Sequence, residues 1–171
     1  KERLAERLKV QPSNLIIGNG SDELIVLVVR AFLNEGEEAV VADRTFLIYK
    51  LAVTAQNGKV VSVPMKNFRY DLNRMKEAIT KKTKIVFIAN PDNPNGTYVT
   101  KKEVDEFLKR LPPDLILFFD EAYYEFVGDD SVKDYPDMMK YLRKRNLIIT
   151  RTFSKVYGLS GLRVGYGISN P

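Results

Sequence analysis

The chain has 171 residues, of which 44% are hydrophobic, so it is long enough for one domain with a sizeable core and too short for two ordinary domains. Its net charge is +5, yet basic and acidic residues alternate along segments such as 101–110, which favours solvated helix faces over a nucleic-acid-binding tract. Cysteine and histidine are both absent, and this excludes disulfides, thiol nucleophiles, the usual zinc sites and a Ser-His-Asp triad.

The first ten residues, KERLAERLKV, predict an amphipathic helix and do not have the pattern of a signal peptide. No apolar run approaches the roughly 20 residues of a membrane span, and the sequence has neither a glycine-aromatic RNA motif nor a zinc-ligand spacing. We therefore expect a cytoplasmic protein with no membrane or nucleic-acid partner. Because the sequence starts without Met inside a helical pattern and stops after a strand-like segment, we also expect a piece of a longer protein.

Short β-branched and apolar runs alternate with segments of helical period, a pattern that predicts an α/β fold with a largely parallel sheet. We expect strands at Leu15–Gly18, Ala39–Ala42, Val60–Val63, Ile85–Ala89, Leu115–Asp120, Leu147–Thr152 and Arg163–Ile168. We expect helices at Ser21–Phe32, Phe46–Ala55, Asp71–Ile79, Lys101–Arg110 and Tyr135–Arg145, with Thr100 as an N-cap. No repeat, low-complexity tract or linker divides the chain, so residues 1–171 are predicted to form one domain.

The first candidate site element is GNGSDELI, residues 18–25, where a predicted strand gives way to a helix. Free N–H groups at a helix start can bind a phosphate, glycine lets the backbone approach closely, and the positive end of the helix dipole favours an anion. The alternative is an ordinary helix capped by Ser21 or Asp22, and the local sequence alone favours that alternative.

Two further elements follow buried strands. In ANPDNPNGTYV, residues 89–99, Asn-Pro and Asn-Gly steps force a turn, and asparagine side chains there can point into the crevice where α/β proteins bind ligands. In LILFFDEAYYEF, residues 115–126, an apolar strand ends in Asp120 and Glu121, and a buried carboxylate is costly unless it is paired. The alternatives are a helix cap for Asp120 and simple packing for Tyr123 and Tyr124.

The fourth element is TFSKVYGLSGLRVG, residues 152–165, in which one lysine lies among hydroxyl residues and Arg163 follows a glycine-containing loop. A lysine amine can form a Schiff base with a carbonyl, and a guanidinium with hydroxyls can hold an anionic group. Lys155 is therefore the candidate nucleophile, against the alternative of an ordinary surface lysine.

Together these elements resemble the fold-type I aminotransferases, which use pyridoxal phosphate, and DEAYYEF and GNGSDE resemble the histidinol-phosphate aminotransferases in particular. The resemblance covers nearly the whole chain. It implies the PLP-dependent transferase large domain, a three-layer α/β/α fold whose mainly parallel seven-stranded sheet has one antiparallel strand. It also implies that the amino-terminal arm and the carboxy-terminal small domain of the family are absent from residues 1–171.

The resemblance assigns three catalytic roles by position. Lys155 would hold the cofactor and carry a proton, Asp120 would pair with its pyridine nitrogen, and Tyr123 would bond its phenolic oxygen. The implied cofactor-binding residues are Gly20, Ser21, Asp22, Phe46, Asn93, Asp120, Tyr123, Thr152, Ser154, Lys155 and Arg163. For Phe46, which the family stacks on the pyridine ring, core packing is an equally good interpretation. Two positions depart from the family pattern: Asn95 replaces the usual threonine, and Arg44 replaces an expected proline.

The implied reaction of the intact enzyme is the transfer of an amino group between histidinol phosphate and 2-oxoglutarate, so the expected partners are a small amino donor and a 2-oxo acid. Aromatic amino-acid aminotransferases and threonine-phosphate decarboxylases share much of the same core and remain alternatives. A folding module with a vestigial site is another. We expect this chain alone to bind pyridoxal phosphate with little turnover, and self-association is a further expectation because the family dimerises through the large domain.

Overall fold

The computed structural model describes residues 1–127 and 132–171 and contains one seven-stranded sheet in the order β1-β7-β6-β5-β4-β2-β3. Among the described strands, β7 is antiparallel to both of its neighbours and the other pairs are parallel. The strands are β1 (Leu15–Asn19), β2 (Glu38–Ala42), β3 (Lys59–Val63), β4 (Thr83–Ala89), β5 (Ile116–Asp120), β6 (Leu147–Thr152) and β7 (Val164–Ser169). The predicted mainly parallel sheet with one antiparallel strand is confirmed.

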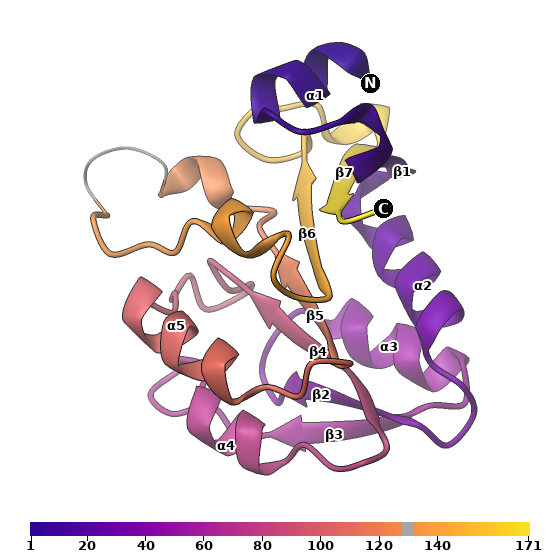
Figure 1. Ribbon diagram of the computed structural model, residues 1–171, viewed down its shortest axis with the longest axis vertical. Coiled ribbons are helices and arrows are strands. Elements are labelled where there is room, and N and C mark those ends of the chain that lie inside the picture. The colour runs from indigo at the N-terminus through magenta and orange to yellow at the C-terminus, as the bar shows by residue number, and fades with distance from the viewer. Residues whose placement is uncertain (128–131) are drawn as a thin grey trace.

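Helices cover both faces of this sheet, which gives the predicted three layers (Figure 1). The helices α2 and α3 lie together on one side, and α4 and α5 lie together on the other. Their bounds, with those of α1, are α1 (Glu2–Leu8), α2 (Gly20–Phe32), α3 (Leu47–Ala55), α4 (Leu72–Glu77) and α5 (Lys101–Arg110). Across residues 1–127 and 132–171, no helix combines the length and apolar content needed to cross a bilayer.

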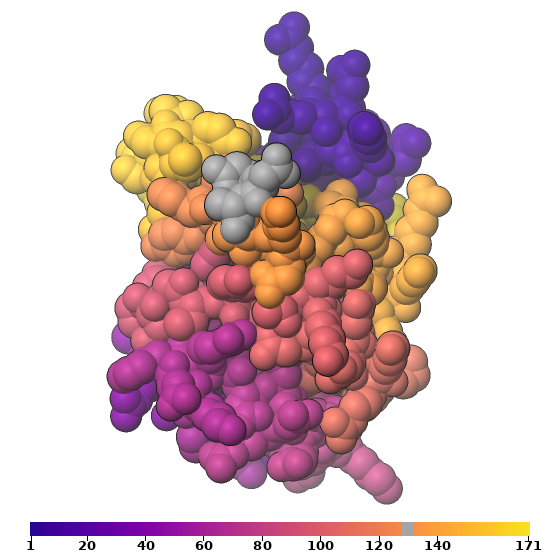
Figure 2. All heavy atoms as spheres, turned by 90° about the vertical axis from the view of Figure 1, so that its left-hand side faces the viewer, coloured from indigo at the N-terminus to yellow at the C-terminus, as the bar shows by residue number. Residues whose placement is uncertain are grey.

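The predicted helix at Tyr135–Arg145 is wrong, because the structure has there only the short 3₁₀ helix η3 (Met138–Tyr141) between turns. Pro136 restricts the conformation of Tyr135 alone, and the rest of the segment is held by contacts with other parts of the chain. Tertiary hydrogen bonds then hold the segment, since Tyr135 Oη donates to Asn90 O and the Arg145 guanidinium donates to Leu108 O. Figure 2 shows this segment, in orange, lying on the surface beside α5.

The first residues of α5 match the predicted helix cap, whereas α2 begins without a side-chain cap. Thr100 caps α5 as predicted, and its hydroxyl accepts from the Glu103 N–H in a capping box. At α2 the structure does not have the alternative arrangement, a helix capped by Ser21 or Asp22. The helix begins one residue earlier, at Gly20, and the N-cap residue Asn19 makes no side-chain capping bond. The first turn of α2 therefore keeps amide donors that no capping side chain uses.

The register of the sheet brings the ends of the parallel strands to one edge. Ala89 of β4 pairs with Asp120 of β5, and Asp120 pairs with Thr150 of β6. Because parallel strands point the same way, the segments after these residues emerge side by side. The antiparallel strand β7 begins at that same edge, where Thr152 pairs with Gly165. Three of the four predicted site elements therefore meet through strand pairing alone.

The fourth element, the start of α2, meets this edge through a close backbone approach. The Gly20 N–H donates to Arg163 O at 2.9 Å. A Cβ on Gly165 would lie 2.5 Å from both the Gly20 carbonyl carbon and the Ser21 nitrogen. These are backbone atoms, so a side chain at residue 165 requires β7 and α2 to move apart.

We predict that Gly165→Ala lowers the free energy of unfolding by about 1–3 kcal/mol, the range that overpacking of a tight contact causes. Gly161→Ala is the matched control, because nothing lies within 4 Å of its Cβ position. Urea unfolding of both variants and the parent chain measures the difference. Equal stability of the two variants would contradict the close approach of β7 to α2.

Candidate functional site

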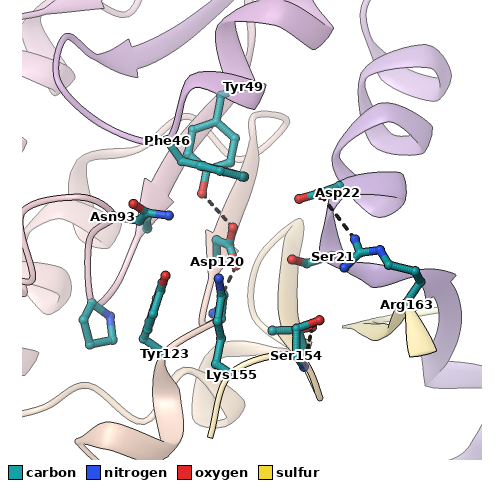
Figure 3. Close-up of a pocket in the computed structure, with 14 residues that line it drawn as sticks. Ser21, Asp22, Phe46, Tyr49, Asn93, Asp120, Tyr123, Ser154, Lys155 and Arg163 are labelled. Atoms are coloured by element: carbon teal, nitrogen blue, oxygen red, sulfur yellow. Dashed lines mark hydrogen bonds and ion pairs between the residues drawn. The ribbon is translucent and has the colours of Figure 1, made fainter. Parts of the chain in front are cut away.

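Ten of the eleven predicted cofactor-binding residues line one cavity of about 110 Å³ at the carboxyl edge of the sheet (Figure 3). Gly20, the eleventh residue, lies immediately behind the cavity wall, where its Cβ position is 2.4 Å from the Arg163 guanidinium. The predicted residues that line the cavity are Ser21, Asp22, Phe46, Asn93, Asp120, Tyr123, Thr152, Ser154, Lys155 and Arg163.

Asp120 ends β5 at the bottom of the cavity, and its side chain is only 4% exposed. Its Oδ2 accepts from Tyr49 Oη at 2.7 Å, and its Oδ1 accepts from Thr150 Oγ1 and the Ala122 N–H, both at 3.1 Å. Burial raises the pKa of the carboxyl, while these three hydrogen bonds act to lower it. Within residues 1–127 and 132–171 all of its partners are neutral, and it forms no ion pair.

Lys155 follows β6 in an exposed loop, and its side chain points into the cavity that Asp120 and Tyr123 also line (Figure 3). The distance from Lys155 Nζ to the centroid of the Tyr123 ring is 5.0 Å. The loop is braced at its start, where Thr152 Oγ1 donates to Ser154 Oγ at 3.0 Å and accepts from the Ser154 N–H at 3.1 Å. The structure thus brings an accessible amine, a phenol and a buried carboxylate to one cavity.

A second group of polar side chains surrounds the start of α2. Gly20 has a φ of 74°, a conformation that glycine adopts without strain, and it begins the helix below the Arg163 guanidinium. One Arg163 nitrogen lies 3.4 Å from Asp22 Oδ2, so this cation offsets the carboxylate that stands nearest the helix start. Together with the hydroxyls of Ser21 and Ser154, the helix amides and the guanidinium form an arrangement suited to a phosphate.

Phe46 and Asn93 line the opposite side of the cavity from Arg163 (Figure 3). Phe46 is the N-cap residue of α3 and packs edge-on against Tyr49, with ring centroids 5.6 Å apart. The turn that carries Asn93 is fixed by Asp92, which accepts from Thr45 Oγ1 and Asn95 Nδ2, each at 2.6 Å. Asn95, which replaces the usual threonine, therefore bonds within this turn.

Arg44, which replaces the expected proline, is exposed. Its guanidinium carbon lies 5.9 Å from the centroid of the Phe68 ring, and its carbonyl accepts from Asn95 Nδ2 at 2.9 Å. Neither departure from the family pattern introduces a side chain into the cavity.

Sequence reasoning missed the hydroxyl donors of Asp120. Tyr49 lies three residues after Phe46 on α3, a spacing that indicates only a buried helix face, and Thr150 lies inside an apolar strand. Neither position carries a local signal of a polar contact, because each partner lies more than 25 residues away along the chain. A buried carboxylate at a strand end does predict that donors exist, but not which residues supply them.

A separate ion pair lies behind the cavity at the next residue of the chain. Glu121 is fully buried, and its Oε2 accepts from Arg151 Nε at 2.8 Å and lies 2.7 Å from another nitrogen of the same guanidinium. The guanidinium carbon lies 3.7 Å from the centroid of the Tyr124 ring. Neither Glu121 nor Arg151 lines the cavity. Burial raises the pKa of Glu121 to about 7, although Arg151 acts to lower it.

The whole chain, residues 1–171, matches the family model described as aminotransferase class I and II. It is 47% identical to the histidinol-phosphate aminotransferase of Moorella thermoacetica, covering 100% of this chain and 44% of that protein. It is 46% identical to histidinol-phosphate aminotransferase 2 of Carboxydothermus hydrogenoformans, covering 99% of this chain and 46% of that protein. The chain thus spans less than half the length of these curated relatives.

Solved structures show the same relationship. The histidinol-phosphate aminotransferase from Sinorhizobium meliloti in complex with pyridoxal-5'-phosphate matches with a TM-score of 0.90 and 34% identity, over 98% of this chain and 45% of that one. The aromatic aminotransferase from Pyrococcus horikoshii OT3 matches with a TM-score of 0.84 and 29% identity, over 99% of this chain and 48% of that one. The resemblance drawn from the four motifs is confirmed.

We predict a pH dependence of stability from Glu121. Its pKa in the folded chain, about 7, is above the ordinary value of 4.5, so folding favours the protonated form. Its contribution to stability is therefore fully present below about pH 4.5 and is lost as the pH rises through about 7, a change on the order of 3 kcal/mol. Urea unfolding between these pH values should show a fall in the free energy of unfolding that Glu121→Gln reduces. The same slope in both proteins would refute the assignment.

Proposed function

Since the chain belongs to the class I and II aminotransferase family, we propose that residues 1–171 are the pyridoxal-phosphate-binding large domain of an enzyme that transfers an amino group between histidinol phosphate and 2-oxoglutarate. The observation that carries the proposal is the environment of Asp120. A buried carboxylate with only neutral donors faces the same cavity as an accessible lysine and a phosphate-suited helix start. A cationic ring nitrogen on a phosphorylated cofactor complements that combination of groups.

The residues present fit the cofactor at both of its ends. Gly20, Ser21, Thr152, Ser154 and Arg163 would hold the phosphate, with the charge of Asp22 offset by Arg163. Residue 20 is glycine with a φ of 74°, and a Cβ there would displace the Arg163 guanidinium from its position beside the helix start.

At the other end of the cavity, Asp120 would pair with the pyridine nitrogen and Phe46 would stack on the ring. Asn93 and Tyr123 would bond the phenolic oxygen. Bound pyridoxal phosphate supplies a carbonyl for amines and an electron sink for the carbon that loses a proton.

The chain's own groups have distinct tasks in this proposal. Lys155 Nζ would hold the cofactor covalently and, once displaced by a substrate amine, would move the proton at the substrate α-carbon. Tyr123, which lies against Lys155, would orient the phenolic oxygen beside that amine. Asp120 would stay ionised and keep the ring nitrogen protonated, because a cation nearby favours the charged form of a buried carboxyl.

The substrate assignment rests on the relatives, which are histidinol-phosphate aminotransferases that are 41–47% identical across this chain. The aromatic aminotransferase from Pyrococcus horikoshii is more distant, at 29% identity. We further propose that the intact enzyme is a cytoplasmic homodimer, and that residues beyond these 171 complete the substrate site, because the chain spans less than half the length of its relatives.

We predict that the purified chain binds pyridoxal phosphate through Lys155. Titration with the cofactor should give a saturable absorbance band, and borohydride reduction followed by peptide mapping should place the label on Lys155. Lys155→Ala should abolish the band. Lys102→Ala, which removes an exposed lysine of α5 far from the cavity, is the matched control and should leave the band unchanged. Labelling of Lys155 no greater than that of other exposed lysines would instead support a folding module with a vestigial site.

We also predict that the loaded chain turns over poorly. Transamination of histidinol phosphate with 2-oxoglutarate should be at least about 100-fold slower than in a full-length relative assayed alongside, because substrate positioning depends on parts outside residues 1–171. Single-turnover spectra and steady-state rates measure the two stages separately. A rate equal to that of the full-length relative would show that these residues are sufficient for the whole reaction.

A further inference from the structure

Tyr49 is a fully buried tyrosine whose hydroxyl reaches the floor of the cavity. Its ring stacks on Phe87 of β4, with centroids 4.8 Å apart and an interplanar angle of 16°. Phe46 packs edge-on against the same ring, at 5.6 Å and 84°. The hydroxyl donates to Asp120 Oδ2 at 2.7 Å (Figure 3). One side chain therefore contacts both the residue proposed to stack on the cofactor ring and the residue proposed to pair with its nitrogen.

The three donors to Asp120 are not equivalent. Thr150 and the Ala122 N–H bond Oδ1 at 3.1 Å and belong to β6 and to the turn after β5, so both come from the sheet itself. Tyr49 alone among them bonds Oδ2, at the shorter distance, and comes from a helix that packs on the sheet. The plane of the carboxylate is fixed when both oxygens are held from different directions. Tyr49 therefore contributes orientation that the sheet donors do not supply.

The charged and titratable groups near this hydrogen bond favour Tyr49 as the donor. Tyr70 and Asp92 act on Tyr49, and Asp22 acts on Asp120. Lys155 and Tyr123, from the loops after β6 and β5, line the same cavity. Burial, followed by the charge of Asp120, raises the pKa of Tyr49 well above its ordinary value. The hydroxyl consequently keeps its proton over the working pH range and acts as a donor to the carboxylate.

We propose that Tyr49 is a positioning residue, which holds the Asp120 carboxylate in the ionised form and orientation needed to pair with the cofactor's ring nitrogen, and sets Phe46 beside it. The inference rests on the proposed function, because it concerns the same cavity. A hydrogen bond to a charged group is among the stronger ones in proteins, so its removal from a buried carboxylate has a measurable effect.

The test is the equilibrium affinity of Tyr49→Phe for two ligands: pyridoxal phosphate, and its analogue in which a C–H group replaces the ring nitrogen. Phenylalanine keeps the ring that stacks on Phe87 and removes only the hydroxyl. We expect the variant to bind pyridoxal phosphate about 10-fold more weakly than the parent chain and to bind the analogue with a change of less than about twofold. The matched control is Tyr141→Phe, which removes another tyrosine-to-aspartate bond, to Asp105, away from the cavity.

Each outcome decides the inference. Equal weakening for both ligands would mean that Tyr49 acts by packing alone, and an unchanged affinity for pyridoxal phosphate would mean that it has no role; either result overturns the proposal. Asp120→Asn supplies a second measurement, because in that background the further change Tyr49→Phe should not alter the ratio of the two affinities. A large additional change in the ratio there would also overturn it.

Different results would contradict the proposed function and the inference about Tyr49. If the parent chain does not bind pyridoxal phosphate, the cofactor assignment is wrong. If it binds both ligands equally, the role of Asp120 is wrong. Only a parent chain that prefers pyridoxal phosphate, combined with a Tyr49→Phe variant that keeps the same preference, contradicts the inference about Tyr49 alone.

Discussion

A carboxylate buried at the end of β5 without a cationic partner is the constraint on which the candidate site depends. Asp120 is 4% exposed, and its recorded partners in the described chain are two hydroxyls and one backbone amide. Neutral donors offset only part of the cost of removing a charge from water. The carboxylate therefore remains available for a cation that enters the cavity, and the side chains around it, from Phe46 to Lys155, define what kind of cation fits.

Glu121, the next residue, is also a buried carboxylate, but it has a cationic partner inside the fold. Glu121 follows β5 and meets the Arg151 guanidinium at 2.7 Å, whereas Asp120 accepts from Thr150, the residue before Arg151 in β6. Because successive residues in a strand point to opposite faces, the two carboxylates are bonded on opposite faces of β6. The Glu121 carboxyl group already has a cationic partner within the fold, and Tyr124 covers the guanidinium. The two neighbouring carboxylates thus differ in their partners. Glu121 is paired with Arg151 of β6, whereas Asp120 has no cationic partner in the described chain and lines the candidate cavity. The paired strands consequently carry a structural contact on one face and a candidate binding group on the other.

Much of the fold and most of the cavity lining could be predicted from the sequence, because both follow from local patterns. Apolar runs predicted all seven strands, and parallel strands deliver their carboxyl ends to one edge, where the motifs lie. The wrong helix prediction and the missed role of Tyr49 have the same physical cause. Tyr135–Arg145 has helical period but is held by bonds from Tyr135 and Arg145 to distant carbonyls, and Tyr49 looks like a core residue until its partner across the fold is known. Contacts between residues far apart in sequence leave no periodic signal.

The start of α2 lies at the end of the cavity where Arg163 stands, opposite Phe46 and Asn93. Asn19 does not cap the helix with its side chain, and Gly165 is small enough for β7 to lie against Gly20 and Ser21. The first-turn amides of α2 therefore have no capping side chain, and at the other end of the cavity the recorded partners of the Asp120 carboxylate are all neutral. A ligand with an anionic group and a cationic ring satisfies the two ends together, so its binding energy would offset costs that the fold already carries. Such a ligand would stabilise the folded chain, because it would bind a preorganised arrangement that the unfolded chain lacks.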